Sequence, residues 1–563
     1  MRTNCFRKTT AGHGRLPLLV FAAAGLSLAA MGVTCVGRRE PSEPREHRDV
    51  ELPPYLKETI GEVTRFAGRE PIPIQGYGFV TGLDGTGTRV VPPGVRQTIL
   101  AMMLRYDVDD PEAVLASPDT AVVSVGGRLR PGVGKGEPFD LEIRALPNTE
   151  TTSLEGGFLL ACDLTRVVAG RGGELRSERR AVGRGSIFVS PFATDDKPGT
   201  AIDPRVGRVL AGGWALEARR FRLALLAPSV RTAEQVVRLI NARFPGAAQG
   251  TRDPGRVDLE VPEAFQDDKP RLLDLVGALY MRETPDARDT RVNLLVETLK
   301  TGEDMDRAAI CLEAFGAAVL PRLRPLADHP RESVRFYVGR AMAHLQDGQA
   351  LHVLEPIAMD GRSEFQEGAV RALGCFENGL GLGVIGRALD ADDTRVRIAA
   401  WRAMRRANPR TSVVRVFEDK FALSVIPTRA GPFVYVARNL HPHLAVFGDV
   451  CLRPPLLAET RRVTATASAG ADRVILFARR RGVDLKVEAL LDLRSVIEKA
   501  ASPLGLDKHN EPQGLDLTYS DVVGLLNELA RKRAMSGPMV LEPLEYRVIG
   551  DRPTARPISV GEP

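Results

Sequence analysis

The sequence predicts a mixed α/β fold of the α+β type that an all-helical segment interrupts. Two observations predict this fold class. Between about residues 55 and 265, short apolar runs such as Ala121–Val125 and Phe139–Ile143 are bounded by Gly and Pro, which is typical of strands. From about Lys269 the apolar residues recur at helical spacing instead, and strand-like runs return only after about Thr411.

The length and composition limit the class of protein. A chain of 563 residues exceeds one ordinary hydrophobic core, so several domains are expected. Apolar residues make up 44% and charged residues 26%, as in folded globular proteins. The formal net charge is +6, but four of the positive residues lie in the first 34 positions, which contain no acid. The remainder is close to neutral, so its charge gives no support for nucleic-acid binding.

The N-terminus has the layout of an export signal. Basic residues up to Arg15 precede an almost unbroken apolar run, Leu16–Val33, which is typical of a secretory signal peptide over residues 1–35. Cys35 stands where a lipoprotein would be cleaved and acylated, so lipidation at Cys35 and plain signal cleavage are alternatives. Residues 36–54, rich in Pro, Glu and Arg, are predicted to be a linker. We therefore expect a periplasmic protein, anchored to the outer membrane if Cys35 is lipidated.

The region 55–265 is predicted to mix strands with two helices. Beyond the two runs above, Gly185–Val189 and Arg256–Val261 have strand character. Helices are expected at Gly94–Tyr106 and Thr232–Phe244, where apolar residues recur at helical spacing.

The helical region 266–410 contains an internal repeat. An Arg-Ala pair followed by Met or Leu occurs three times, at successive offsets of 31 residues, on segments Arg340–Met342, Arg371–Leu373 and Arg402–Met404. Helix, acidic turn and helix with a small-residue face resemble HEAT-type repeats, in which Ala lets paired helices approach. An ordinary helical bundle is the alternative. The predicted repeat face consists of Arg340, Ala341, Arg371, Ala372, Arg402 and Ala403.

Strands and helices alternate again over 411–550, before a polar tail at 551–563. The predicted strands are Val413–Phe417, Phe421–Pro427, Phe433–Ala437, Arg473–Phe477, Met539–Leu541 and Tyr546–Ile549. The predicted helices are Leu491–Ala501 and Ser520–Arg533. The helical region thus lies between two mixed α/β segments.

The segment Gln75–Gly87 carries five glycines, which indicates a loop with positive φ angles or close approach of neighbouring chain. A P-loop requires Lys and then Ser or Thr after the last glycine, whereas Thr88 and Arg89 stand there. A Rossmann fingerprint requires a preceding strand, but prolines precede this segment. An aspartic-protease loop requires Asp-Thr-Gly in order, whereas a glycine separates Asp84 from the threonine. We expect Asp84 to cap its own turn rather than to act as a catalytic acid.

Histidines and cysteines form no recognisable metal or catalytic motif. His441 and His443 flank Pro442 as an H-x-H pair, but a surface turn is the better interpretation because no third ligand is near in sequence. The sequence has no CxxC pair, no H-E-x-x-H and no nucleophile elbow. We therefore predict no metal, no cofactor and no catalytic residue.

The glycine-rich segment and its surroundings resemble the flagellar P-ring protein family. The family signature is matched at Gly76-Tyr77-Gly78 and from Gly82 to Gly87. Further similarities follow in the family's order at Gln97–Leu104, Val122–Val125, Arg128–Gly132, Phe139–Ile143 and Thr152–Leu160. A weaker similarity recurs at Leu517–Leu526 and Pro538–Leu541, so the repeats would interrupt a P-ring-like protein rather than follow one.

The resemblance implies a non-catalytic structural subunit of a periplasmic ring that acts as a bushing around the flagellar rod. It implies further copies of the chain, rod proteins and L-ring proteins as partners, with peptidoglycan as a candidate contact and an unknown protein partner for the repeats. Structural or subunit-contact roles would fall to the signature residues Gly76, Tyr77, Gly78, Gly82, Asp84, Gly85, Thr86 and Gly87.

Two departures from the family motivate an alternative. The family lacks helical repeats, and its signature continues into Asp where this chain has Thr88. Together with Cys35, these departures are compatible with an envelope lipoprotein scaffold that uses a P-ring-derived fold and HEAT-like repeats for protein binding in a non-flagellar complex. A peptidoglycan hydrolase would follow only from the expected location, and no acid/base pair or metal triad supports it.

Overall fold

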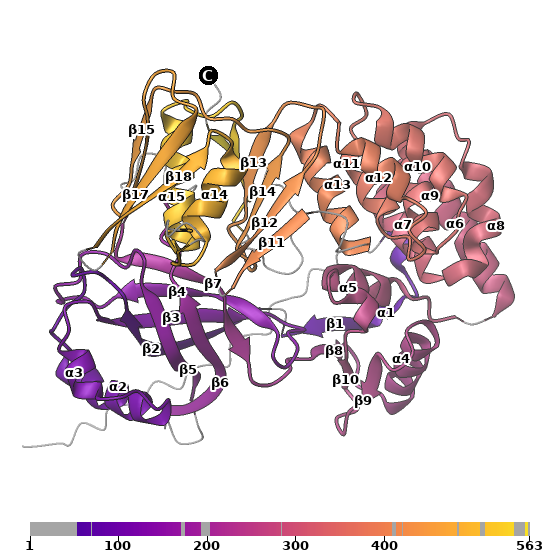
Figure 1. The fold of residues 1–563 in the computed structure, drawn as a ribbon. Helices are drawn as coiled ribbons and strands as arrows, with labels where there is room; N and C mark the ends of the chain where they lie inside the picture. Colours follow the sequence, from indigo (N-terminus) through magenta and orange to yellow (C-terminus); the bar gives the residue numbers. More distant parts are fainter. Residues whose placement is uncertain are drawn as a thin grey trace, which may run out of the picture. The chain divides into compact units, whose positions relative to one another are not determined.

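A computed structural model describes residues 53–68, 70–169, 175–192, 203–282, 284–407, 413–418, 420–480, 483–506, 513–544 and 558–560. The chain forms several sheets and a long helical segment, which confirms the predicted mixed α+β class (Figure 1). The signal segment 1–35 with Cys35, nearly all of the linker and the predicted strand Tyr546–Ile549 lie outside the described residues. No helix within the described ranges is both long enough and apolar enough to cross a lipid bilayer.

Six antiparallel strands close into a barrel in the order β2–β3–β4–β7–β6–β5. The strands are β2 (Ile72–Thr81), β3 (Ala121–Leu129), β4 (Pro138–Ala145), β5 (Phe158–Ala169), β6 (Leu175–Ser186) and β7 (Val206–Ala215). Along β4, Phe139, Leu141 and Ile143 are buried and the residues between them are not, because successive strand residues face opposite sides. Two helices, α2 (Pro93–Arg105) and α3 (Pro111–Leu115), connect β2 to β3.

A second sheet is antiparallel throughout and has the order β1–β8–β10–β9. Its elements are β1 (Thr64–Ala67), β8 (Phe221–Leu225), β9 (Ala248–Gly250) and β10 (Arg256–Leu259), with the helices α1 (Ile60–Val63) and α4 (Val230–Arg243). Helix α4 packs on β9 and β10 through its buried residues Val236 and Ile240. Ser229 caps α4 by accepting a hydrogen bond from the Thr232 N–H.

The helical segment follows directly. Its helices are α5 (Lys269–Ala278), α6 (Pro285–Thr301), α7 (Met305–Ala314), α8 (Leu320–Leu323), α9 (Glu332–His344), α10 (Ala350–Met359), α11 (Gln366–Leu373), α12 (Leu382–Ala388) and α13 (Thr394–Ala407). Short 3-10 turns occur at Pro54–Leu56, Glu263–Phe265, Gly316–Val319 and Arg324–Leu326. Helix α7 contacts α9, α9 contacts α11 and α11 contacts α13, so alternate helices stack side by side (Figure 1). The three Arg-Ala copies lie on α9, α11 and α13.

The C-terminal part contains two sheets. A six-stranded mixed sheet has the order β11–β12–β14–β13–β19–β20, and a four-stranded antiparallel sheet has the order β15–β16–β17–β18. The strands are β11 (Val413–Phe417), β12 (Phe421–Ile426), β13 (Phe433–Val436), β14 (His443–Phe447), β15 (Leu456–Glu459), β16 (Val463–Ala467), β17 (Arg473–Arg480), β18 (Val483–Leu490), β19 (Met539–Leu541) and β20 (Ile558–Val560). Helices α14 (Leu493–Ala501) and α15 (Tyr519–Arg531) share one core with both sheets.

The four helices predicted outside the repeat region are confirmed as α2, α4, α14 and α15, each within two residues at either end. Strand predictions were less accurate. The segment Gln75–Thr81, expected as a loop, belongs to β2, because its glycines let neighbouring strands approach. Of the predicted strand Gly185–Val189, β6 includes only the first two residues, and Phe188 then forms an isolated bridge.

The expected surface turn at the H-x-H pair is also wrong in part. His441 is exposed, but His443 is buried at the start of β14. Strands β14, β15, β16 and β18 were not predicted, and β20 lies within the tail predicted as polar. Short strands rich in Ala and Thr, such as β16, have too little hydrophobic contrast to be recognised by periodicity.

Candidate functional site

The first half of the signature segment lies in β2, where glycine permits close packing between strands. A Cβ atom on Gly76 would stand 2.3 Å from the carbonyl oxygen of Asp163, and one on Gly78 would stand 2.5 Å from Leu159 Cδ1. Both contacts are far shorter than a side chain tolerates. Tyr77, between the two glycines, is exposed on the barrel surface. The expected close approach is therefore found at Gly76 and Gly78.

The second half forms the turn that follows β2. Gly82 and Gly85 have φ angles of +79° and +80°, a region that residues with a Cβ rarely adopt. Gly87 has an ordinary φ, but a Cβ there would lie 2.0 Å from the carbonyl oxygen of Thr120. Each glycine of the turn thus has a physical reason of its own.

Side-chain hydrogen bonds hold this turn. The Thr86 hydroxyl contacts two carbonyl oxygens, Leu83 O at 2.8 Å and Ser153 O at 2.9 Å. The Gly85 N–H donates to Asp119 Oδ1 at 2.7 Å. A distant carboxylate, that of Asp119, therefore accepts the turn hydrogen bond that was expected for the signature aspartate.

Asp84 itself pairs with a residue from the C-terminal part of the chain. Its Oδ2 lies 2.6 Å from Arg462 Nη2, and Arg462 Nε lies 3.9 Å from Asp521 Oδ1. The Arg462 guanidinium lies against Gly156, where a Cβ would be only 1.2 Å from Nη1. Arg462 is mostly buried, with its side chain 13% exposed, and Asp521 is fully buried at 1%. The arginine therefore joins the signature turn to the start of α15.

Asp521 has a structural role in its own helix. Its Oδ2 accepts hydrogen bonds from the Thr518 N–H at 3.0 Å and the Thr518 hydroxyl at 2.8 Å, in the capping box of α15. Its Oδ1 is buried without a hydrogen-bond partner among the described atoms, so Arg462 supplies the nearest compensating charge. Nearby, burial raises the pKa of Glu155, and the negative charge of Asp521 raises it further.

A cavity of about 330 Å³ lies between the signature turn and the C-terminal part. Two basic side chains in its lining form ion pairs with acids, Arg462 with Asp84 and Asp521, and Lys420 with Asp516. Lys420 Nζ also donates to the Ala501 carbonyl oxygen at 2.8 Å. Three of the lining acids are thus ion-paired, an arrangement that suits a packed junction between segments better than acid/base catalysis.

The predicted repeat face divides into packed and polar residues. The three alanines, Ala341, Ala372 and Ala403, are buried, as expected for positions where helices approach. The three arginines form ion pairs with different acids: Arg340 with Asp306, Arg371 with Glu367, and Arg402 with Glu542. Only the last of these pairs connects the helical segment to the C-terminal part.

The remaining sequence predictions concern metals and the histidine pair. Within the described ranges, no group of three or more His, Cys, Asp and Glu side chains is placed to hold a metal ion. His443 packs edge-on against Trp401 with 5.1 Å between ring centroids, and its Nε2 lies 2.8 Å from Ser424 Oγ. Burial, and then the charge of Arg405, lower the pKa of His443 to about 3.

The profile of the flagellar P-ring protein family matches residues 59–299 of this chain. The match reaches past the barrel and the second sheet, and it includes α5 and most of α6. The sequence prediction had placed both of these helices in the region 266–410, so the family-like part extends further than expected.

Curated flagellar P-ring proteins are also similar to this chain. A flagellar P-ring protein of Caulobacter vibrioides is 30% identical over 229 residues, which are 37% of this chain and 59% of the relative. The chain thus spans less than two thirds of that protein. One from Caulobacter sp. K31 is 29% identical over 54% of this chain and 78% of the relative. One from Thermotoga maritima is 30% identical over 44% of this chain and 73% of the relative. On this extent of similarity, the chain belongs to the flagellar P-ring protein family.

Proposed function

We propose that the chain is a non-catalytic structural subunit of a P-ring-like assembly that forms a periplasmic bushing around the flagellar rod. Family membership supports the assembly. The observation that carries the structural role is the signature turn, in which Asp84 forms an ion pair with Arg462 and so joins the turn to the C-terminal part of the chain. Its glycines serve close packing and turn geometry, which are features of a folding and assembly element.

The proposed partners follow from the same role. Copies of this chain would form the ring, rod and L-ring proteins would contact it, and peptidoglycan would surround it. No nucleic acid and no cofactor enter this proposal. The export signal over residues 1–35 supports a periplasmic location, with Cys35 as the candidate anchor to the outer membrane.

The stacked helices α7–α13 extend the family-like fold by a surface for an unidentified protein partner. The regular packing of alternate helices supports this binding surface, because stacked helix pairs typically offer extended surfaces to other proteins. The signature residues Gly76, Tyr77, Gly78, Gly82, Asp84, Gly85, Thr86 and Gly87 are proposed to shape the subunit that enters the ring.

Electron microscopy of the mature chain, purified from its native envelope, tests the ring. Closed rings coaxial with a rod, together with loss of swimming when the gene is deleted, are expected. Monomers or small oligomers in cells that still assemble normal flagella would contradict the proposal. That outcome would favour the envelope lipoprotein scaffold, which labelling of Cys35 with a fatty-acid analogue would then check.

A further inference from the structure

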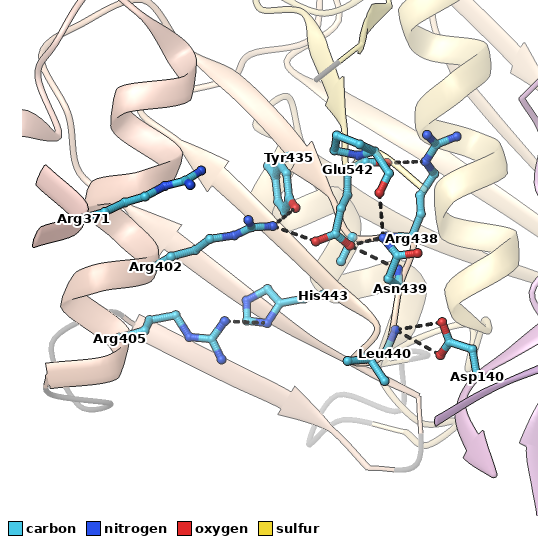
Figure 2. A network of polar contacts seen from close by, with 12 residues as sticks. Asp140, Arg371, Arg402, Arg405, Tyr435, Arg438, Asn439, Leu440, His443 and Glu542 are labelled. Atoms are coloured by element: carbon cyan, nitrogen blue, oxygen red, sulfur yellow. Dashed lines mark hydrogen bonds and ion pairs between the residues drawn. The ribbon is translucent and has the colours of Figure 1, made fainter. Parts of the chain in front are cut away.

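Three consecutive backbone N–H groups in the connection between β13 and β14 donate to two carboxylates from distant parts of the chain. The amides of Arg438 and Asn439 both donate to Glu542 Oε2, at 2.9 and 3.1 Å. The next amide, that of Leu440, lies 3.0 and 3.1 Å from the two carboxylate oxygens of Asp140 (Figure 2). Leu440 has a φ of +49°, and a turn with such a residue directs successive N–H groups toward anions. This turn, residues 438–440, is here called the coupling turn.

On one side the coupling turn is attached to the barrel. Asp140 lies on β4 where the pairing with β7 shifts register, and its Oδ1 accepts the Ala211 N–H at 2.8 Å. Its Oδ2 accepts from Arg208 Nη2 at 2.7 Å, and Arg208 Nη1 donates to the Arg438 carbonyl oxygen at 2.8 Å. Two donors from β7, the Ala211 N–H and the Arg208 guanidinium, therefore orient the Asp140 carboxylate toward the coupling turn.

On the other side the coupling turn is attached to the helical segment. Glu542, just beyond β19, accepts from Arg402 of α13 with 2.6 Å between Oε1 and Nη2. The same guanidinium nitrogen donates to the Tyr435 hydroxyl of β13 at 2.5 Å. Arg438 Nε donates to the Glu542 carbonyl oxygen at 2.6 Å, which fixes the backbone of that residue as well. Figure 2 shows the path from α13 through Glu542 and the turn to Asp140.

We propose that Asp140 and Glu542 are positioning residues of one joint that fixes the helical segment relative to the barrel, so that both move as a single body. The two carboxylates are mostly buried, with side chains 15% and 17% exposed. Charge-assisted hydrogen bonds in such surroundings are among the strongest a protein makes, and an amide left without its acceptor there is costly. Because adjacent amides of one turn bind both acids, displacing one acid reorients the donor that the other requires.

Amide hydrogen exchange of the full chain, followed by mass spectrometry, tests this joint. Glu542→Ala removes the acceptor of Arg402 and of two turn amides, so faster exchange is expected over residues 394–407 and 433–447. The joint also requires exchange to rise by about tenfold or more over 206–215 on β7, a described strand that makes no hydrogen bond to Glu542 and is linked to it only through the coupling turn and Asp140. Asp140→Asn tests the coupling in the other direction, from the barrel to the helical segment, and should accelerate amide exchange in α13. Glu542→Gln, which keeps one acceptor oxygen, should show smaller rises in the same fragments.

Glu355→Gln is the matched control, because Glu355 pairs with Arg387 between α10 and α12 and has no part in the coupling turn. Its effect should stay within those two helices. Where Glu542→Ala lowers the yield of folded chain, Arg402→Lys tests the same link, since Lys keeps the charge but cannot reproduce the guanidinium contacts. The proposal would be overturned if exchange over 206–215 stayed unchanged in every Glu542 and Arg402 variant. It would also be overturned if Glu355→Gln accelerated exchange over 206–215 as much as Glu542→Ala does. This inference goes beyond the proposed function, and its test is independent of ring formation.

Discussion

Asp84 and Arg462 form an ion pair with 2.6 Å between Oδ2 and Nη2, although 378 residues separate them along the chain. The pair places the family signature against a segment that the family profile does not reach. The same arginine faces the carboxylate of Asp521, which is buried, whereas that of Asp84 is partly exposed to water. The stability of the chain should depend much more on the arginine than on Asp84.

Arg462→Met should lower the free energy of unfolding by about 3 kcal/mol, because it leaves the buried Asp521 carboxylate without its compensating charge. Asp84→Asn should cost only about 1 kcal/mol or less, since Asp84 is 36% exposed and water can replace the lost contact. Urea denaturation of both variants measures the difference. Equal losses would show that the contact with Asp521 contributes nothing beyond the surface pair.

Gly156→Ala should be more destabilising than Gly85→Ala, although both residues have positive φ angles of +72° and +80°. The strain of a Cβ at such an angle costs about 1 kcal/mol at either position. A Cβ on Gly85 would meet no atom of the described residues within 4 Å, whereas one on Gly156 would displace the Arg462 guanidinium. We expect an additional loss of about 2 kcal/mol for Gly156→Ala, measured by the same urea titration. Matching midpoints for the two variants would contradict the packing of Arg462 on Gly156.

The sequence was sufficient to predict features that arise from local pattern. Helices such as α4 and α15 have long apolar periodicity, and their predicted ends agree with the structure within two residues. The five signature glycines were expected to serve positive φ angles or close approach, and the structure provides one of these reasons for each. Helical periodicity and positive φ angles are decided by neighbours in the chain, whereas the partners of the close-approach glycines, such as Asp163 for Gly76, are distant in sequence and were not predicted.

Features that depend on distant partners were not predicted. Nothing in the sequence around Arg462 indicates that it meets Asp84, and nothing around Glu542 indicates that it meets Arg402. Asp84 was expected to cap its own turn, but Asp119 accepts the Gly85 N–H instead. Such contacts are set by how the sheets and helices pack, and residue spacing contains no information on that packing.

Ala372→Leu should lower the free energy of unfolding by about 2 kcal/mol, because Ala372 is buried on α11 between neighbouring helices and added methyl groups force them apart. Arg371→Leu is the adjacent control. The Arg371 side chain is 60% exposed and, among the described residues, pairs only with Glu367 in the same helix, so its loss should stay within about 0.5 kcal/mol. Thermal unfolding of both variants provides the comparison. A stability for Ala372→Leu equal to that of the control would mean that these helices are not closely packed at the repeated alanine.

Protonation of His443 should destabilise the chain in acid. Its folded-state pKa, lowered to about 3 by burial and by Arg405, lies below the unfolded value of about 6.5. Between these values the unfolded chain binds a proton that the folded chain does not, so stability is complete above about pH 6.5 and falls progressively toward pH 3. Arg405 of α13 lies 3.4 Å from Nδ1, and Ser424 of β12 lies 2.8 Å from Nε2, so the neutral ring can accept from one and donate to the other.

His443→Gln should therefore flatten the dependence of unfolding free energy on pH by on the order of 3 kcal/mol between pH 7 and pH 4, even if it lowers stability at pH 7. Urea titrations at a series of pH values measure this slope. His352→Gln is the control, because His352 is exposed on α10 and does not act on His443, so it should leave the slope unchanged. If the His443→Gln variant lost as much stability in acid as the unchanged chain, the prediction would be wrong. The acid sensitivity would then have to come from carboxylates, and β14 would tolerate a charged imidazole beside Arg405.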